Sequence, residues 1–151
     1  MSKEIERKFL VRSSEYRDLA IQKKEMMQGY LSLDPDATVR VRIVDEEAFI
    51  TVKSRNKGAV RNEWEYSIPV DEGTEMLKTC CKSRLIEKTR HIVEAGDGLK
   101  WEIDEFHGSL DGLVVAEIEL PEEDYPVILP EFVGKEVTGD PRYYNSSLAS
   151  L

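Results

Sequence analysis

The sequence contains little of the chemistry on which several common sites depend. Only two of its 151 residues are cysteines and only two are histidines. Cys80 and Cys81 are adjacent, and a disulfide between neighbours is strained. Without a Cys/His spacing typical of a metal site, we expect both to be reduced, partly buried helix residues. The sequence also has no glycine-rich phosphate-binding loop, which argues against P-loop and dinucleotide-binding sites.

Long apolar runs are missing as well. No segment approaches the roughly 18 apolar residues of a membrane-spanning helix. The charged N-terminus has no apolar region like that of a signal peptide. We therefore expect a cytoplasmic protein with no membrane partner. No linker, repeat or low-complexity tract interrupts the chain, so we expect residues 1–151 to form a single domain.

The chain has fewer basic than acidic residues. The chain has 30 acidic residues against 21 Lys and Arg, for a net charge of -9. Binding to nucleic acid or to an anionic membrane requires a basic face, so we expect no nucleic-acid duplex as a partner. The deficit does not exclude a local basic pocket, because the 21 cationic side chains must lie somewhere.

What the sequence does contain is a recurrent strand pattern. Turn signals such as Asp34-Pro35-Asp36 and Gly96-Asp97-Gly98 separate segments in which apolar and charged residues alternate. Their spacing is typical of antiparallel hairpins. We expect eight strands, at 3–11, 26–33, 38–45, 47–54, 61–69, 84–94, 98–106 and 113–121. Helices are expected from Ser13-Ser14 to about Gln22, at about 73–83, near 129–134 and after Asn145.

The charged faces of these strands carry like charges in pairs. Side chains two residues apart on a strand share a face and lie about 7 Å apart. The pairs are Glu4/Glu6, Arg40/Arg42, Glu63/Glu65, Lys88/Arg90, Glu102/Asp104 and Glu117/Glu119. At an effective dielectric of about 20, each pair costs on the order of 2 kcal/mol before salt screening. On a solvated sheet face, water could screen the repulsion within each pair. The repetition of such pairs along the chain instead favours bound ligands of opposite charge.

The two kinds of pair predict two kinds of ligand. Several converging carboxylates suit Mg²⁺ or Mn²⁺, and converging Arg and Lys side chains suit a chain of phosphates. Together they predict a metal–polyphosphate site that supports phosphoryl transfer. Eight antiparallel strands can close on themselves. We therefore predict an α+β, mainly β, fold: a closed eight-stranded antiparallel β-barrel with a charged lumen and helices packed outside.

The N-terminal segment EIERKFLV, residues 4–11, resembles the E-x-E-x-K signature of the CYTH domain, the triphosphate tunnel metalloenzyme superfamily. The remaining charged residues follow in the family's order. The segments QGYL at 28–31 and EVTGDPRYYNSSLA at 136–149 also resemble the short bacterial members. The resemblance covers essentially the whole chain. It implies an eight-stranded antiparallel tunnel that holds a triphosphate group and a divalent metal ion, Mg²⁺ or Mn²⁺.

The resemblance also implies roles for individual residues. The metal ligands that it implies are Glu4, Glu6, Asp104, Glu117 and Glu119. Three further carboxylates would support these ligands or bind an additional metal ion: Glu63, Glu65 and Glu102. The triphosphate contacts that it implies are Lys8, Arg40, Arg42, Lys53, Lys88 and Arg90.

Lys88 and Tyr30 are the candidates for orienting or deprotonating the attacking water. A lysine among arginines could have a depressed pKa, because neighbouring positive charge disfavours its own charge. Lys88 fits that description. Tyr30 lies on the same strand face as Gln28 and Ser32, so it could point into the lumen. The alternative for Tyr30 is a packing aromatic.

Three functions are compatible with such a site. The first is a metal-dependent triphosphatase acting on inorganic tripolyphosphate or a small organic triphosphate, such as thiamine triphosphate or a nucleoside triphosphate. The alternative is a class IV-type adenylate cyclase that converts ATP to cyclic AMP and pyrophosphate, which needs a pocket for adenine and ribose. The third is a polyphosphate-binding module without turnover. The segment PEEDYPVILPEFVG, 121–134, could cover a tunnel mouth or contact a partner, so a homodimer stays open.

Overall fold

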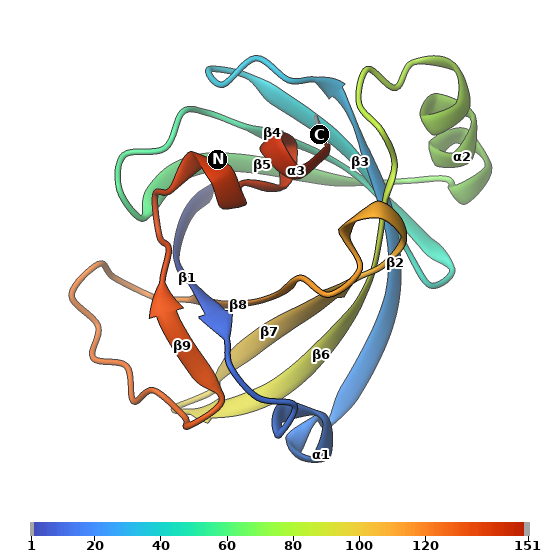
Figure 1. The fold of residues 1–151 in the computed structure, drawn as a ribbon. Coiled ribbons are helices and arrows are strands. Elements are labelled where there is room, and N and C mark those ends of the chain that lie inside the picture. The colour runs from blue at the N-terminus through green and yellow to red at the C-terminus, as the bar shows by residue number, and fades with distance from the viewer. Residues whose placement is uncertain (1, 150–151) are drawn as a thin grey trace.

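The computed structural model describes residues 2–149, and its strands form one antiparallel sheet that closes into a barrel (Figure 1). The strands follow the order β5-β4-β3-β2-β6-β7-β8-β1, and β1 pairs again with β5. The barrel strands are β1 (Ser2–Val11), β2 (Gln22–Ser32), β3 (Thr38–Val44), β4 (Glu47–Lys53), β5 (Val60–Ile68), β6 (Ile86–Gly96), β7 (Leu99–Phe106) and β8 (Val114–Glu119). The predicted eight-stranded antiparallel barrel is confirmed.

Strand β1 closes the barrel by pairing with three other strands. On one edge, Glu6–Leu10 pair with β8. On the other edge, Ser2–Ile5 pair with β5, and Phe9 and Val11 pair with the short strand β9 (Val133–Glu136). Strand β9 therefore extends the sheet where β5 no longer covers β1.

The helix predicted near 129–134 is wrong, because β9 takes up the end of that segment. Pro130 restricts the backbone before it, and Phe132 is buried by packing against the barrel. At Gly134 an added Cβ would lie 3.3 Å from the Leu10 carbonyl oxygen, so the segment lies tightly along β1. Ile128 is 91% exposed, and a partner contact of this segment stays a prediction.

The α-helices of the structure are short: α1 (Tyr16–Leu19), α2 (Val70–Thr79) and α3 (Asn145–Ala149). Helix α1 ends earlier than predicted because Ala20 is extended and leads into β2. Helix α2 ends before both cysteines, since the chain turns back toward β2 and the Lys82 N–H donates to the Tyr30 carbonyl. Cys80 is exposed rather than partly buried, and both thiols are free. Within the described residues, none of the helices has the length and apolar character to cross a membrane.

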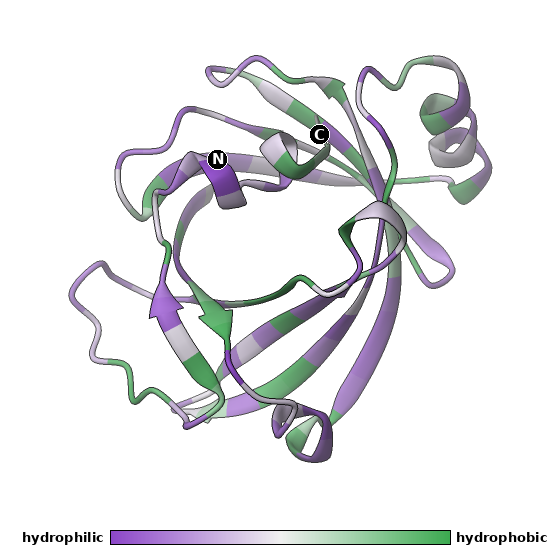
Figure 2. Ribbon diagram, viewed as in Figure 1, coloured by the Kyte–Doolittle hydropathy of each residue, from purple (hydrophilic) through white to green (hydrophobic). Residues whose placement is uncertain are grey.

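The apolar faces of the strands point outward and form the main core on the outside of the barrel. Figure 2 shows the alternation of hydrophilic and hydrophobic residues along the strands. This outer core contains Phe9, Tyr16, Val93, Trp101, Ile103, Ala116, Ile118, Leu120, Phe132 and Val133. The Phe9 and Trp101 rings pack edge to face with centroids 5.6 Å apart. The charged faces are thereby directed inward.

A second apolar cluster lies at one end of the lumen. It contains Tyr30, Ile86, Phe106, Val115, Leu148 and Ala149, and we refer to it as the floor. Leu148 and Ala149 belong to α3, so this helix packs at the end of the barrel rather than on its outer wall. The charged part of the lumen therefore lies above an apolar base.

Candidate active site

The inward-facing charged side chains surround a cavity of about 160 Å³. The residues that line it are Glu4, Glu6, Arg40, Arg42, Lys53, Arg61, Glu63, Glu65, Arg90, Glu102, Glu117, Glu119 and Asn145. Most of the residues predicted for the site are therefore brought together. Four are placed lower, toward the floor, and do not belong to the described lining: Lys8, Tyr30, Lys88 and Asp104.

Charges of opposite sign occupy two arcs of the barrel wall. The neighbouring strands β7, β8 and β1 contribute five carboxylates to the lining, and β3, β4 and β6 contribute four cations. Strand β5 contributes both kinds, with Arg61 beside Glu63 and Glu65. A ligand in the cavity thus meets a predominantly anionic wall on one side and a predominantly cationic wall on the other.

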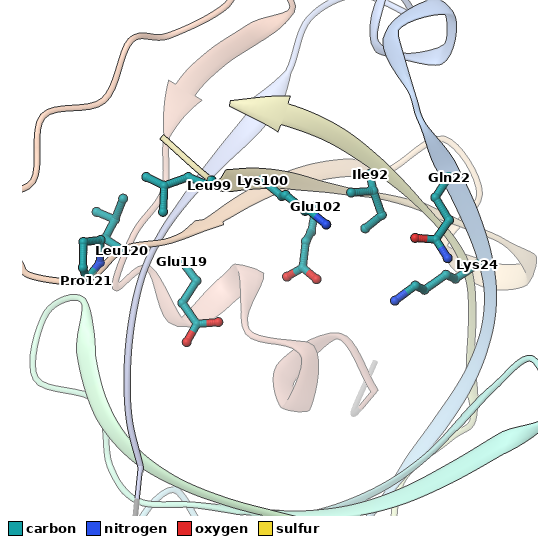
Figure 3. Close-up of a pocket in the computed structure, with 10 residues that line it drawn as sticks. Gln22, Lys24, Ile92, Leu99, Lys100, Glu102, Glu119, Leu120 and Pro121 are labelled. Carbon is teal, nitrogen blue, oxygen red and sulfur yellow. The ribbon is translucent and has the colours of Figure 1, made fainter. Parts of the chain in front are cut away.

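The cavity is continuous with a wider pocket of about 470 Å³ at the end of the barrel away from the floor. Glu102 and Glu119 line both spaces. Figure 3 shows these two carboxylates and the Lys24 ammonium group pointing into the barrel from its rim. A small charged molecule can enter from this mouth.

Within the anionic arc, the pKa values of Glu4 and Glu6 are shifted in opposite directions. The Lys53 Nζ lies 2.8 Å from Glu4 Oε2, and the Arg61 Nε lies 3.8 Å from Oε1. Burial alone would raise the pKa of Glu4, but Lys53, Glu63 and Arg61 outweigh burial and lower it. Burial and the nearby Glu117 and Glu4 instead raise the pKa of Glu6 well above its ordinary value. A bound cation would relieve this repulsion.

Two further carboxylates of the cavity lining have raised pKa values. Burial and the neighbouring Glu4 carboxylate raise the pKa of Glu63 to about 7. Burial, Glu4 and Glu102 raise the pKa of Glu119. Carboxylates crowded in this way are suitable oxygen ligands for Mg²⁺ or Mn²⁺, which would compete with protons for them.

In this structure the carboxylates are partly engaged by cations of the protein. Glu117 Oε1 lies 3.5 Å from Lys8 Nζ, and Glu4 is paired with Lys53. Consistent with this pairing, the described residues contain no group of three or more His, Cys, Asp or Glu side chains already arranged to hold a metal ion. Metal binding would therefore require the glutamates to exchange ammonium partners for the ion.

The cationic arc is held in place by polar side chains of the neighbouring strands. Arg42 Nε donates to Gln28 Oε1 at 2.9 Å. Arg40 Nη2 donates to Thr51 Oγ1 at 3.4 Å. Burial, Arg40 and Arg90 lower the pKa of Arg42 to about 9. The mutual repulsion of these guanidinium groups favours the binding of a polyanion between them.

Below the cavity, Lys88 lies among polar partners. Its Nζ lies 2.7 Å from Asp104 Oδ2 and donates to Asn145 Oδ1 at 3.2 Å. The pKa of Lys88 is lowered to about 7, and burial is the largest cause. The positive charges of Arg90 and Arg42 lower this pKa further, whereas the negative charge of Asp104 raises it. The lowered pKa that the neighbouring arginines suggest from sequence is thus present, with burial as its main cause.

Tyr30 and Lys8 also lie at this lower level. The Tyr30 ring is 5% exposed and packs in the floor with Ile86 and Phe106. Tyr30 therefore has the packing role considered as its alternative, and a role in positioning water stays a prediction. Lys8 Nζ donates to the Tyr143 carbonyl at 3.1 Å, two residues before the first residue of α3.

Sequence reasoning missed two lining residues, Arg61 and Asn145. Arg61 precedes Glu63 by two positions, so the same alternation would have placed it on the inner face of β5. Asn145 begins α3 and reaches the cavity only because the chain folds back under the barrel. No periodicity in the sequence marks this residue.

Comparisons with known proteins agree with this fold. Residues 2–144 match the model of the CYTH domain family. The chain is 47% identical over 150 residues to an inorganic triphosphatase of Acetivibrio thermocellus, covering 98% of this chain and 94% of the relative. It is 40% identical over 149 residues to an inorganic triphosphatase of Nitrosomonas europaea, covering 97% and 96%.

A solved structure supports the same assignment. The crystal structure of an inorganic triphosphatase superposes with a TM-score of 0.69 at 38% identity, covering 97% of both chains. The two arcs of lumen charge described above lie on a barrel of this type. The chain belongs to the CYTH domain family.

Proposed function

We propose that this protein is a metal-dependent triphosphatase that hydrolyses inorganic tripolyphosphate. The observation that carries the proposal is the cavity between a carboxylate arc and a cation arc. Relatives that are 47% and 40% identical over nearly the whole chain are named inorganic triphosphatases, which favours hydrolysis over cyclisation. Thiamine triphosphate and nucleoside triphosphates are the alternative substrates.

The cation arc would hold the phosphate chain. Arg40, Arg42, Lys53 and Arg90 project from β3, β4 and β6 into one cavity, and Arg61 joins them from β5. Guanidinium groups bind phosphate oxygens through paired N–H donors and stabilise the charge of the transition state. The fixed positions of these strands would leave little reorganisation to be made during the reaction.

The opposite arc would hold Mg²⁺ or Mn²⁺. Glu4, Glu6, Glu117 and Glu119 are the proposed ligands, with Glu63, Glu65 and Glu102 beside them. When bound, the ion would neutralise phosphate charge and align the anhydride for in-line attack by water. The raised pKa of Glu6, caused by burial and by Glu117 and Glu4, supports this part of the proposal.

We assign the acceptance of a proton from the attacking water to Lys88. With a pKa lowered to about 7, mainly by burial, a large fraction of Lys88 is neutral at neutral pH. A neutral amine can donate its two N–H groups to Asp104 and Asn145, which are its neighbours, and it keeps a lone pair for the proton. Tyr30 is the proposed assistant in orienting the water.

The test is product release from tripolyphosphate, thiamine triphosphate and ATP, each with Mg²⁺, Mn²⁺ or EDTA. Orthophosphate, pyrophosphate and cyclic AMP are all measured. We expect orthophosphate from tripolyphosphate, lost with EDTA and in Glu4→Ala but kept in Glu75→Ala, a matched change on the exposed face of α2. Cyclic AMP and pyrophosphate from ATP would reassign the protein as a cyclase. Binding without any product would indicate a polyphosphate-binding module.

A further inference from the structure

Asp104 differs in location from the other carboxylates assigned to the metal. It is 2% exposed and does not belong to the described lining of the cavity, whereas Glu4, Glu6, Glu117 and Glu119 do. It lies on β7 between the cavity and Phe106 of the floor. An ion bound in the cavity would therefore be nearer to the other four carboxylates.

Both carboxylate oxygens of Asp104 are already engaged. Arg90 donates to it through two parallel bonds, from Nε to Oδ1 at 2.7 Å and from Nη2 to Oδ2 at 2.9 Å. Lys88 Nζ lies 2.7 Å from Oδ2. Such a fork of two N–H donors fixes both the position and the plane of a guanidinium group. Asp104 thus makes three short contacts with cations.

The neighbouring carboxylate on the same strand face provides a contrast. Glu102 lines both the cavity and the mouth, and its side chain is 35% exposed. It contacts Arg90 only through Nη1, at 3.1 Å. Asp104 does not contact Nη1 of the Arg90 guanidinium group. This nitrogen lies beside Glu102, which lines the cavity.

We propose that Asp104 is a positioning residue that fixes Arg90 and Lys88 under the phosphate chain, and that Glu102 rather than Asp104 belongs to the metal-binding carboxylates. This inference rests on the proposed triphosphatase function. Arg90 held by Nε and Nη2 keeps the second N–H of Nη1 for a phosphate oxygen, beside the one that it donates to Glu102. Lys88 held by Asp104 and Asn145 keeps its position below the cavity. A small displacement of such groups reduces catalysis strongly without affecting a metal bound elsewhere.

The test compares Asp104→Asn with Glu102→Gln, two isosteric amides on one strand face. The affinity for Mn²⁺ is measured without substrate by electron paramagnetic resonance, and kcat and KM are measured with tripolyphosphate. We expect Asp104→Asn to keep the Mn²⁺ affinity within about twofold and to lower kcat by about 100-fold. We expect Glu102→Gln to weaken Mn²⁺ binding by at least about tenfold.

Two results would overturn the proposal. Equal losses of Mn²⁺ affinity in the two variants would make Asp104 a metal ligand. An unchanged kcat in Asp104→Asn would remove its positioning role. A purely structural role predicts a lower melting temperature with an unchanged kcat for the molecules that remain folded, so active-site titration and thermal melts accompany the kinetics.

A second variant distinguishes loss of function from loss of folding. Asp104→Asn leaves the Arg90 guanidinium group without its buried carboxylate partner, which destabilises a fold. The double variant Asp104→Asn/Lys88→Met removes both members of the short Lys88–Asp104 contact, so that no buried amine is left without its carboxylate; it should keep the Mn²⁺ affinity while kcat stays low. Loss of Mn²⁺ binding in a folded double variant contradicts the proposal. If the unaltered protein released no orthophosphate, the proposed function would fail, but the comparison of Mn²⁺ affinities would still decide the assignment of Asp104.

Discussion

The two sides of strand β7 place opposite chemistry within the thickness of one sheet. Trp101 and Ile103 point outward into a packed apolar core, where both are almost completely buried. Glu102 and Asp104 point inward, where they contact Arg90. On the outside, burial of apolar surface contributes about 25 cal/mol per Å² to folding. On the inside, carboxylates are crowded together, and burial and the nearby Glu117 and Glu4 raise the pKa of Glu6 well above its ordinary value.

The outer faces of the strands therefore stabilise the fold, and the inner faces of the same strands form the candidate active site. A substitution on the outer face should lower stability and leave ligand affinity intact. Replacing an inner carboxylate whose pKa is raised, such as Glu6, should lower activity and leave stability intact, or even increase it. Four substitutions and one change of pH test this separation, from the largest expected effect to the smallest.

Glu6→Gln should have the largest effect on activity. Removing a proposed metal ligand should lower the rate of orthophosphate release by about 1,000-fold. The melting temperature of the metal-free protein at pH 8 should rise, because a neutral amide no longer repels Glu117 and Glu4. A variant that lost activity and stability together would break the separation between the two faces.

Ile103→Ala examines the outer face at the position between Glu102 and Asp104. Ile103 is completely buried in the outer core. Truncation of such a side chain should lower the free energy of unfolding by about 2–5 kcal/mol. Urea denaturation measures this loss, and the Mn²⁺ affinity of the folded variant should equal that of the unaltered protein. A weaker affinity would indicate that outer packing sets the position of the inner carboxylates.

The metal-free protein should lose stability as the pH rises from about 4.5 to about 7. The pKa of Glu63, ordinarily 4.5, is raised in the folded state to about 7, mainly by burial, so unfolded chains release this proton first in that window. Glu6 and Glu119 have raised pKa values and act in the same direction. Thermal melts in EDTA should show a falling midpoint.

Glu63→Gln should flatten this pH dependence, since the variant has no proton to release at that position. Glu4, Asp104 and Glu117 act differently, because their pKa values are lowered and their stabilisation is lost only below about pH 4.5. A midpoint that rises between pH 4.5 and pH 7 would show that the inner carboxylates do not control stability in this range.

Tyr66→Ser should have the smallest effect. Tyr66 lies on the outer face of β5, but it is 60% exposed and so lies outside the packed part of that face. We expect a change in unfolding free energy within about 0.5 kcal/mol and unchanged tripolyphosphate hydrolysis. A larger loss in the urea denaturation curve would indicate that the uncovered part of the outer face also stabilises the barrel.

The alternation of residues predicted most of the barrel because side chains on a strand repeat every two positions. Glu4 and Glu6, for example, lie on the inner face of β1 as their spacing indicates. The two-residue repeat does not predict how far along the lumen each inward-facing side chain lies. Lys88 and Asp104 lie below the cavity because their strands are tilted in a closed barrel and α3 packs beneath them. Such an arrangement depends on the register of several strands at once.

The parts of the fold that the sequence pattern predicted wrongly are set by tertiary contacts. Phe132 and Val133 are apolar neighbours that suit a short helix as well as a strand. Their packing against the outer core and the free edge of β1 decides in favour of β9. In the same way, Asn145 becomes part of the site only through the return of α3 to the end of the lumen.

The pairing of β1 with β5, β8 and β9 also has a consequence for the order in which the molecule assembles. The earliest residues of the described chain have partners that are synthesised much later, and such distant pairings form slowly because long loops must close first. Glu4 and Glu6 lie on this strand. The two proposed metal ligands are therefore made well before the strands that hold them in place, and they can take up their positions only after those distant pairings form.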